Sequence, residues 1–285
     1  MMEQKFFREP STFVGHVELN ITNLASSLEF YQEVIGLQIL EQSERRAVLT
    51  ADGKTGLISL VQPEQAAPKQ ANTTGLYHYA ILLPNRVDLA KVIQHFSELN
   101  IRIGASDHLV SEALYLNDPD GNGIEIYVDR PSSTWTWKNS EVAMTVDPLD
   151  IKDIMGDLGN ESWEGLPAGT VIGHIHLHVS ELKNTEEFYR EGLGFDVVNR
   201  FGAQALFIST GGYHHHIGLN TWAGAGAPAP AENSAGLAFF ALTLPSEGAR
   251  EKVIDRLQGL GYDVERDDEV FMTKDPSGNR IKLQV

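Results

Sequence analysis

The chain has 285 residues, and its 22 Lys and Arg against 39 Asp and Glu give a formal charge of −17. A pI near 4.9 excludes a general nucleic-acid binder, because phosphate neutralisation needs clustered Lys and Arg, and it disfavours anionic membrane surfaces. The absence of cysteine excludes disulfides, thiolate nucleophiles and iron–sulfur clusters, while 42% hydrophobic residues suffice for one large or two modest domains.

No run of about 18 apolar residues occurs, so the sequence predicts no membrane-spanning helix. Residues 1–10 carry four charged side chains and no apolar segment of the kind found in secretion signals. We therefore expect a soluble protein of the cytoplasm.

The opening segments of the two halves of the chain resemble each other. Residues 14–40 begin Val-Gly-His-Val-Glu-Leu, and residues 172–198 begin Ile-Gly-His-Ile-His-Leu. In both segments the first His precedes a Phe-Tyr pair by 14 positions, without a gap. Such self-similarity indicates a duplicated unit.

A second pair of segments repeats in the same way. Residues 75–84 match residues 236–245, and each is followed downstream by the turn sequence Asp-Pro-x-Gly-Asn. These turns, at residues 118–122 and 275–279, precede the last strand of each half and fix its register. The chain therefore consists of two related halves.

Each half divides again into two modules. Every quarter opens with a short apolar strand, continues with an amphipathic helix and ends in β-rich segments, which predicts an α+β fold of four βαβββ modules. We expect helices at 24–35, 86–99, 182–191 and 247–260. The first half spans residues 10–128, with modules at about 13–62 and 75–128, and the second half spans residues 171–285, with modules at about 172–220 and 236–285.

Two segments lie between the modules. Residues 129–170 connect the halves and contain Trp135, Trp137 and an acidic stretch. Residues 221–235 are rich in Gly, Ala and Pro, a composition typical of a flexible lid or spacer.

Histidines recur at one position of the modules. His16, His78 and His174 occupy equivalent places on the first strands of the first three modules, and Phe239 takes that place in the fourth. The last strand of the second module carries Glu125 between two isoleucines, where a carboxylate is costly to bury unless it is paired or binds a metal. The equivalent places in the other modules hold Ser59, Gly218 and Lys282. Each His could simply be a hydrogen-bonded, half-buried residue, but the correlated set favours a 2-His-1-carboxylate metal site.

With these motifs the chain resembles the vicinal oxygen chelate superfamily (glyoxalase/bleomycin-resistance fold), and within it the type I extradiol dioxygenases of the catechol 2,3-dioxygenase type. The resemblance covers the chain apart from its two connecting segments. It implies that the four modules form two incomplete eight-stranded barrels. It also implies cleavage of a small aromatic diol by O2 at Fe2+, with Mn2+, Ni2+ and Zn2+ as alternative ions. Homodimers are common among such proteins and are compatible with the sequence.

The resemblance also implies roles for individual residues. Tyr115, ten positions before Glu125, corresponds to a tyrosine beside the substrate oxygen. His216 corresponds to an acid/base histidine on the last strand of the partner module. Strand alternation places His214 on the face of His216 and His215 on the opposite face. Substrate-binding side chains are expected from His108, His176 and His214.

The pairing of the modules decides which histidine completes the site. Pairing the second module with the third brings together His78, Glu125 and His174, with Tyr115 and His216 in the same cup. Pairing the first with the second puts His16 in place of His174. We expect the former pairing, because it gathers the larger set of residues.

Two other functions have a similar sequence signature. A glyoxalase-type isomerase or lyase uses Ni2+ or Zn2+ and generally adds a second carboxylate, for which this chain offers only Ser59 or Gly218. A binding protein of the bleomycin-resistance kind needs no metal and gives no reason for Glu125 or the row of histidines. The sequence therefore favours the dioxygenase.

Overall fold

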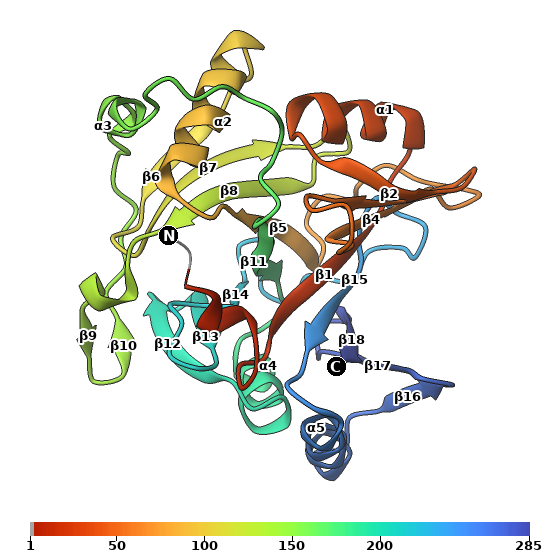
Figure 1. Ribbon diagram of the computed structural model, residues 1–285. Coiled ribbons are helices and arrows are strands. Elements are labelled where there is room, and N and C mark those ends of the chain that lie inside the picture. The colour runs from red at the N-terminus through yellow and green to blue at the C-terminus, as the bar shows by residue number, and fades with distance from the viewer. Residues whose placement is uncertain (1–2) are drawn as a thin grey trace.

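The computed structural model describes residues 3–285, which form two eight-stranded mixed sheets with helices at the periphery (Figure 1). We name them by their modules. Sheet 1/4 has the order β16-β17-β18-β15-β1-β4-β3-β2. Its strands are β1 (Phe13–Asn20), β2 (Gln38–Gln42), β3 (Arg46–Thr50), β4 (Ile58–Val61), β15 (Gly236–Thr243), β16 (Val264–Asp267), β17 (Val270–Lys274) and β18 (Arg280–Gln284).

Sheet 2/3 has the equivalent order, β12-β13-β14-β11-β5-β8-β7-β6. Its strands are β5 (Gly75–Leu82), β6 (Gly104–Asp107), β7 (Ser111–Asn117), β8 (Gly123–Asp129), β11 (Val171–His178), β12 (Asp196–Phe201), β13 (Ala205–Ser209) and β14 (Ile217–Asn220). In both sheets the opening strands of two modules lie antiparallel at the centre. The expected fold is confirmed, and the second module pairs with the third.

Each module carries its helix between its first and second strands. The helices are α1 (Leu24–Glu29), α2 (Arg86–Glu98), α4 (Lys183–Glu187) and α5 (Glu247–Gly259). Asn85 and Ser246 cap the two long helices by accepting hydrogen bonds from the backbone N–H of Asp88 and Ala249. The first and third helices continue as π-helical turns, Phe30–Val34 and Phe188–Gly192, which contain the repeated Phe-Tyr pairs.

The Phe-Tyr pairs and the Asp-Pro-x-Gly-Asn turns meet in the core. The Tyr31 hydroxyl donates to the Asp118 carboxylate at 3.1 Å, and Tyr189 donates to Asp275 at 3.2 Å. Each bond joins two modules of one half that belong to different sheets, and burial raises the pKa of both carboxyl groups. The two repeated motifs therefore tie the sheets together.

The segment between the halves packs on the second module. It contains a 3-10 turn (Ser132–Thr134), the short strands β9 (Trp137–Lys138) and β10 (Glu141–Val142), and α3 (Ile151–Gly156). Asp147 forms two backbone hydrogen bonds with Asp107 at the end of β6, and α3 lies beside α2 in Figure 1. A 3-10 turn (Gln4–Phe7) precedes β1.

Residues 221–235 are packed rather than free. The backbone N–H groups of Gly226 and Ala235 donate to the carbonyls of Ser180 and Ala67, and Thr74 donates to Pro228. These bonds hold the segment, which the sequence suggested to be a flexible lid or spacer, against both halves.

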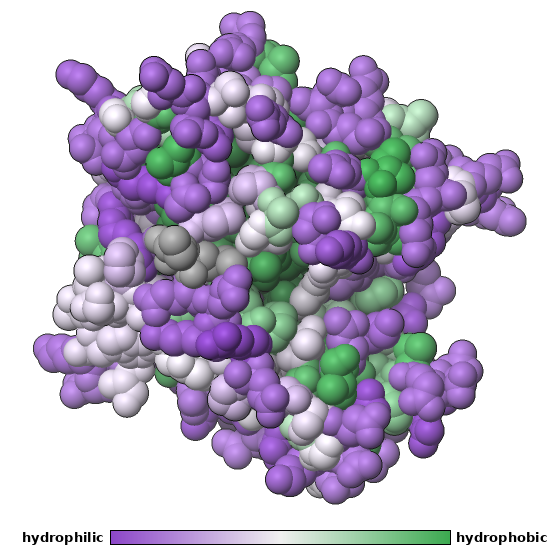
Figure 2. All heavy atoms as spheres, in the orientation of Figure 1, coloured by the Kyte–Doolittle hydropathy of each residue, from purple (hydrophilic) through white to green (hydrophobic). Residues whose placement is uncertain are grey.

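The surface agrees with the composition. The face shown in Figure 2 is mostly hydrophilic, as expected for a chain with a charge of −17. Within residues 3–285, no helix combines the length and the apolar character needed to cross a bilayer.

Candidate metal centre

Three predicted ligands converge on one face of sheet 2/3. The register pairs Ala80 of β5 with Glu125 of β8 on one side and with His174 of β11 on the other. His78 lies two residues before Ala80 and therefore on the same face. The duplicated strands thus place two imidazoles and one carboxylate side by side.

The side chains are close enough to share an ion. His78 Nε2 and His174 Nε2 lie 3.0 and 3.1 Å from Glu125 Oε2, and the candidate ligand atoms all fall within 4.8 Å of one another. All three residues are buried. Burial alone raises the pKa of Glu125, but His174 and His78 outweigh it and hold that pKa well below its usual value.

The hydrogen-bonding state of these residues fits a metal ion. His78 Nε2 is buried and, despite its closeness to Glu125, has no partner with hydrogen-bond geometry among residues 3–285. Burial lowers the pKa of His174, which favours the neutral imidazole. An ionised carboxylate beside a neutral imidazole is the protonation state that binds a divalent cation.

A cavity of about 350 Å³ opens over the three residues. This volume is near the lower end of the range of roughly 300–1,000 Å³ usual for small-molecule sites. Its floor is polar, and its walls are largely aromatic and aliphatic. It is lined by Tyr77, His78, Ser106, His108, Tyr115, Glu125, Met144, Thr145, Val146, His174, His176, Asn199, Phe201, Phe207, His215 and Trp222.

Tyr115 and His108 form a hydrogen-bonded pair in this cavity. Tyr115 is the register partner of Glu125 across β7 and β8, and its hydroxyl lies 2.6 Å from His108 Nε2. His108 Nδ1 lies 2.6 Å from the carbonyl of Thr145, which can only accept, so Nδ1 carries the hydrogen. In the tautomer with its hydrogen on Nδ1, His108 Nε2 accepts a hydrogen bond from the Tyr115 hydroxyl. Both predicted residues line the cavity.

The connecting segment supplies part of the wall, which the sequence did not reveal. Met144, Thr145 and Val146, which lie between β10 and α3 in the sequence, line the cavity. No motif marks them, because their position depends on how residues 129–170 fold back over the second module. Asn199, Phe201 and Phe207 of β12 and β13 were missed for a similar reason, since nothing in the sequence distinguishes them from other strand residues.

The orientation predicted for the histidine triplet is wrong. His215 lines the cavity, with its ring 4.2 Å from that of His174, whereas His214 and His216 are fully buried elsewhere. His216 Nε2 lies 3.0 Å from the carbonyl of Phe6, and burial lowers its pKa to about 3. Alternation fails because β14 begins only at Ile217, so residues 211–216 form a turn rather than a strand.

The two remaining predicted histidines differ in their place. His176 lines the cavity next to His78, with ring centroids 5.0 Å apart, and contacts Trp222. His16 lies in sheet 1/4, where its ring nitrogens are 3.0 Å from the Gly56 carbonyl and from Ser59 Oγ. His16 therefore cannot replace His174 in the cluster.

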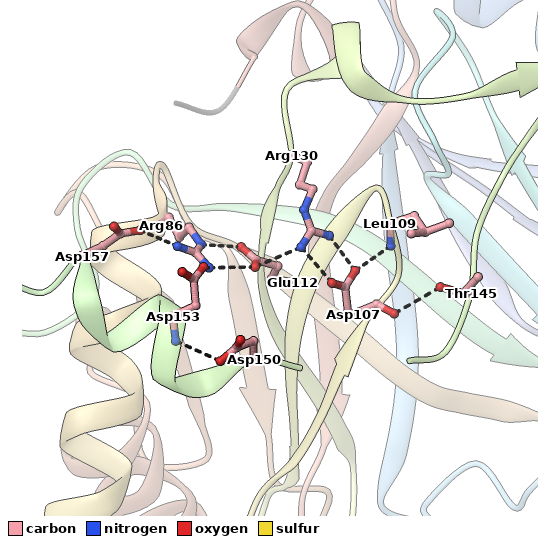
Figure 3. A network of polar contacts seen from close by, with 9 residues as sticks. All are labelled: Arg86, Asp107, Leu109, Glu112, Arg130, Thr145, Asp150, Asp153 and Asp157. Atoms are coloured by element: carbon pink, nitrogen blue, oxygen red, sulfur yellow. Dashed lines mark hydrogen bonds and ion pairs between the residues drawn. The ribbon is translucent and has the colours of Figure 1, made fainter. Parts of the chain in front are cut away.

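An ionic network outside the cavity holds the connecting segment in place (Figure 3). The Arg130 guanidinium binds both carboxylate oxygens of Asp107, at 2.6 and 2.8 Å, and contacts Glu112 at 3.1 Å. Arg86 links the same Glu112 to Asp153 of α3. Since His108 follows Asp107, the network braces the loop that carries the partner of Tyr115.

Comparison with models of protein families shows to which superfamily the chain belongs. The Glyoxalase/Bleomycin resistance protein/Dioxygenase superfamily model matches residues 13–126 and 171–283. The chain belongs to this superfamily. The matched segments contain all three candidate ligands, and the resemblance inferred from the repeated motifs is confirmed.

Individual relatives are more specific. The chain is 47% identical over 278 residues to a catechol-2,3-dioxygenase of Bacillus subtilis (strain 168), covering 96% of this chain and 98% of that protein. Its fold is similar to a putative dioxygenase of Bacillus subtilis subsp. subtilis str. 168, with a TM-score of 0.67, 13% identity and coverage of 95% and 84%. Glyoxalase I from Zea mays follows, with a TM-score of 0.57, 16% identity and coverage of 96% and 92%. At these identities the two structures support the fold alone.

Proposed function

We propose that this protein cleaves catechol or a simply substituted catechol with O2, using Fe2+ held by His78, Glu125 and His174. The observation that carries the proposal is the 2-His-1-carboxylate cluster at the floor of a small cavity. The similarity to a catechol-2,3-dioxygenase over nearly the full length of both chains supports the same reaction.

The ligand set favours oxygen chemistry. Two imidazoles and one carboxylate leave coordination positions open on Fe2+, where a diol and O2 can bind next to each other. No further carboxylate lines the cavity, so the fourth protein ligand that favours a glyoxalase-type reaction is missing among the described residues. Mn2+ has similar ligand preferences, whereas Ni2+ and Zn2+ fit this reaction less well.

The cavity suits a flat, small substrate. Tyr77, Phe207 and Trp222 line the cavity together with side chains of the connecting segment. An aromatic ring would bury its faces against these side chains and present its hydroxyl groups to the floor. His176, which burial keeps at a pKa well below its usual value, would contact the ring as a neutral imidazole.

Two residues would handle the substrate protons. We assign to His215 the acid/base role that the sequence suggested for His216, because His215 alone of the triplet lines the cavity. Burial lowers its pKa well below the usual value, so it is neutral at pH 7 and able to accept a proton. Tyr115, positioned by His108, would hydrogen-bond a substrate oxygen.

The test is anaerobic reconstitution of the metal-free protein with Fe2+, followed by addition of catechol and O2. We expect the yellow product of ring cleavage next to the diol, with uptake of one O2 per ring. Activity on a thiohemiacetal with Ni2+ or Zn2+, but none on catechol, would identify an isomerase. A folded protein that binds catechol but neither binds nor needs a metal would identify a binding protein.

A further inference from the structure

A buried chain of hydrogen bonds leads from the cavity to the end of β8. His215 Nδ1 lies 2.8 Å from His214 Nδ1, and His214 Nε2 lies 2.8 Å from Asp129 Oδ1. The Tyr213 hydroxyl also donates to the Asp129 carboxylate, at 3.0 Å. None of these contacts belongs to the metal cluster.

Strand β8 brings this chain of hydrogen bonds next to the candidate metal ligands. Asp129 lies four residues after Glu125 on β8, so the two carboxylates share one face of the sheet. Tyr127 lies between them, and its hydroxyl is 2.7 Å from that of Tyr213. One strand thus carries a candidate metal ligand and the anchor of the histidine chain.

The hydrogens along the chain can be assigned by elimination. An ionised carboxylate only accepts, so His214 Nε2 carries a hydrogen and donates it to Asp129. His214 is fully buried, and its ring packs against those of His174 and His215. In the tautomer that donates from Nε2, His214 Nδ1 has a lone pair, and the hydrogen between the two rings then belongs to His215 Nδ1.

We propose that Asp129 and His214 are positioning residues that hold His215 in the tautomer with its hydrogen on Nδ1. The nitrogen left for the cavity is then Nε2, with a free lone pair. The role of that lone pair as the base for a substrate hydroxyl rests on the proposed function, whereas the tautomer itself does not.

The arrangement has a chemical consequence. The opposite tautomer of His215 would present an N–H group to the cavity and could not accept a proton there. The hydrogen bond to His214 also fixes the orientation of the His215 ring, because it restrains the rotation of that ring. The carboxylate thereby acts on the cavity through two imidazoles without contacting the substrate.

The direct test is nitrogen-15 NMR of histidine-labelled, full-length protein loaded with Zn2+, with His215 assigned by its loss in His215→Asn. We expect an Nδ1 signal of the protonated type and an Nε2 signal of the lone-pair type. The reverse pattern, or a doubly protonated ring at pH 7, would overturn the proposal.

Asp129→Asn tests the anchor. Its amide can donate as well as accept, so we expect the single tautomer of His215 to change into the other or into a mixture. An unchanged His215 spectrum would show that Asp129 does not set the tautomer. His216→Gln is the matched control, since His216 is equally buried but bonds to Phe6 and Thr210 instead, and it should leave the spectrum as it is.

Kinetics separate positioning from structure. With Fe2+ and catechol, Asp129→Asn should lower kcat by about 10²-fold, the lower range for loss of a general base, with little change in KM. A change in KM alone would contradict a positioning role. If the protein has the expected tautomer but no activity on catechol, the proposed function fails and this inference stands. If it cleaves catechol with His215 in the reverse tautomer, this inference fails and the proposed function stands.

Discussion

The two sheets have the same order of strands, but within residues 3–285 only one of them has a group of side chains that could hold a metal ion. Sheet 2/3 carries His78, Glu125 and His174 at its centre, and the equivalent places of sheet 1/4 are Phe239, Lys282 and His16. The surviving histidine of sheet 1/4 bonds to Gly56 and Ser59, and its ring lies 6.2 Å from Phe239.

The difference shows what the fold contributes and what it does not. Pairing two βαβββ modules brings equivalent positions of neighbouring strands to within reach of one ion, in both sheets. Whether an ion binds depends on the side chains at those positions, since a lysine ammonium in place of Glu125 repels a cation. Each sheet therefore serves as a control for the other.

Glu125→Gln should have the largest effect. The neutral amide is a poor ligand, so we expect loss of the metal. Turnover should fall by more than about 100-fold, because removing a group that only hydrogen-bonds to a metal ligand already costs up to about 100-fold. Metal analysis after gel filtration and a catechol assay measure both. Lys282→Gln, at the equivalent place in sheet 1/4, should change neither. Stoichiometric metal in Glu125→Gln would show that Glu125 is not a ligand.

His174→Ala and His16→Ala compare the two sheets by removing the equivalent histidine from each. We expect His174→Ala to lose the metal, and His16→Ala to keep it and to lose only about 1 kcal/mol of stability with its hydrogen bonds. Metal content and urea denaturation distinguish the two outcomes. Loss of metal from His16→Ala, with retention in His174→Ala, would contradict the assignment.

His215→Asn and His216→Asn test the corrected orientation of the triplet. We expect His215→Asn to lower kcat by about 10²–10⁴-fold, as for loss of a general base, with the metal retained. His216→Asn should keep kcat per bound metal and cost about 1–3 kcal/mol of stability, because it disturbs buried hydrogen bonds. A reversed pattern would restore the role first inferred for His216.

Arg130→Gln should change only the stability of the protein and leave metal binding intact. The guanidinium of Arg130 lowers the pKa of Asp107, mainly through its hydrogen bonds. A lowered pKa in the folded state means that the contribution is present above the unfolded-state value of about 3.9 and is lost as the pH falls through the folded-state value. We expect Arg130→Gln to cost about 2 kcal/mol at pH 7 and less at pH 3, below the unfolded-state pKa of Asp107.

Urea denaturation at the two pH values measures this difference. Arg280→Gln is the control, since Arg280 is an exposed arginine of sheet 1/4 that forms no ion pair within residues 3–285, and it should cost little at either pH. An equal loss for Arg130→Gln at pH 7 and pH 3 would mean that the network in Figure 3 does not act through the Asp107 carboxylate.

The features predicted correctly from the sequence are those that recur in the duplicated modules. Equivalent positions can be compared within one chain. The recurrence of His78 and His174, and the position of Glu125 between two isoleucines, therefore indicated one cluster. The pairing of the second module with the third also followed, because only that pairing gathers the larger set. The role of Tyr31 and Tyr189 as ties to the aspartate turns was not foreseen, although both motifs were recognised.

The rest depended on local backbone geometry. Alternation misplaced His214, His215 and His216 because the strand begins one residue after the triplet. The wall formed by Met144, Thr145 and Val146 could not be foreseen, since it arises from the way a non-repeated segment folds over the second module. Duplication gives no second example of such a segment to compare.

The most direct test is a crystal structure of the protein grown anaerobically with Fe2+, with anomalous diffraction recorded at the iron absorption edge. The account predicts a single strong peak per chain, bound by His78 Nε2, His174 Nε2 and a Glu125 oxygen, and no peak at His16. A peak in sheet 1/4, or these three side chains without iron while the crystals turn catechol yellow, would contradict it.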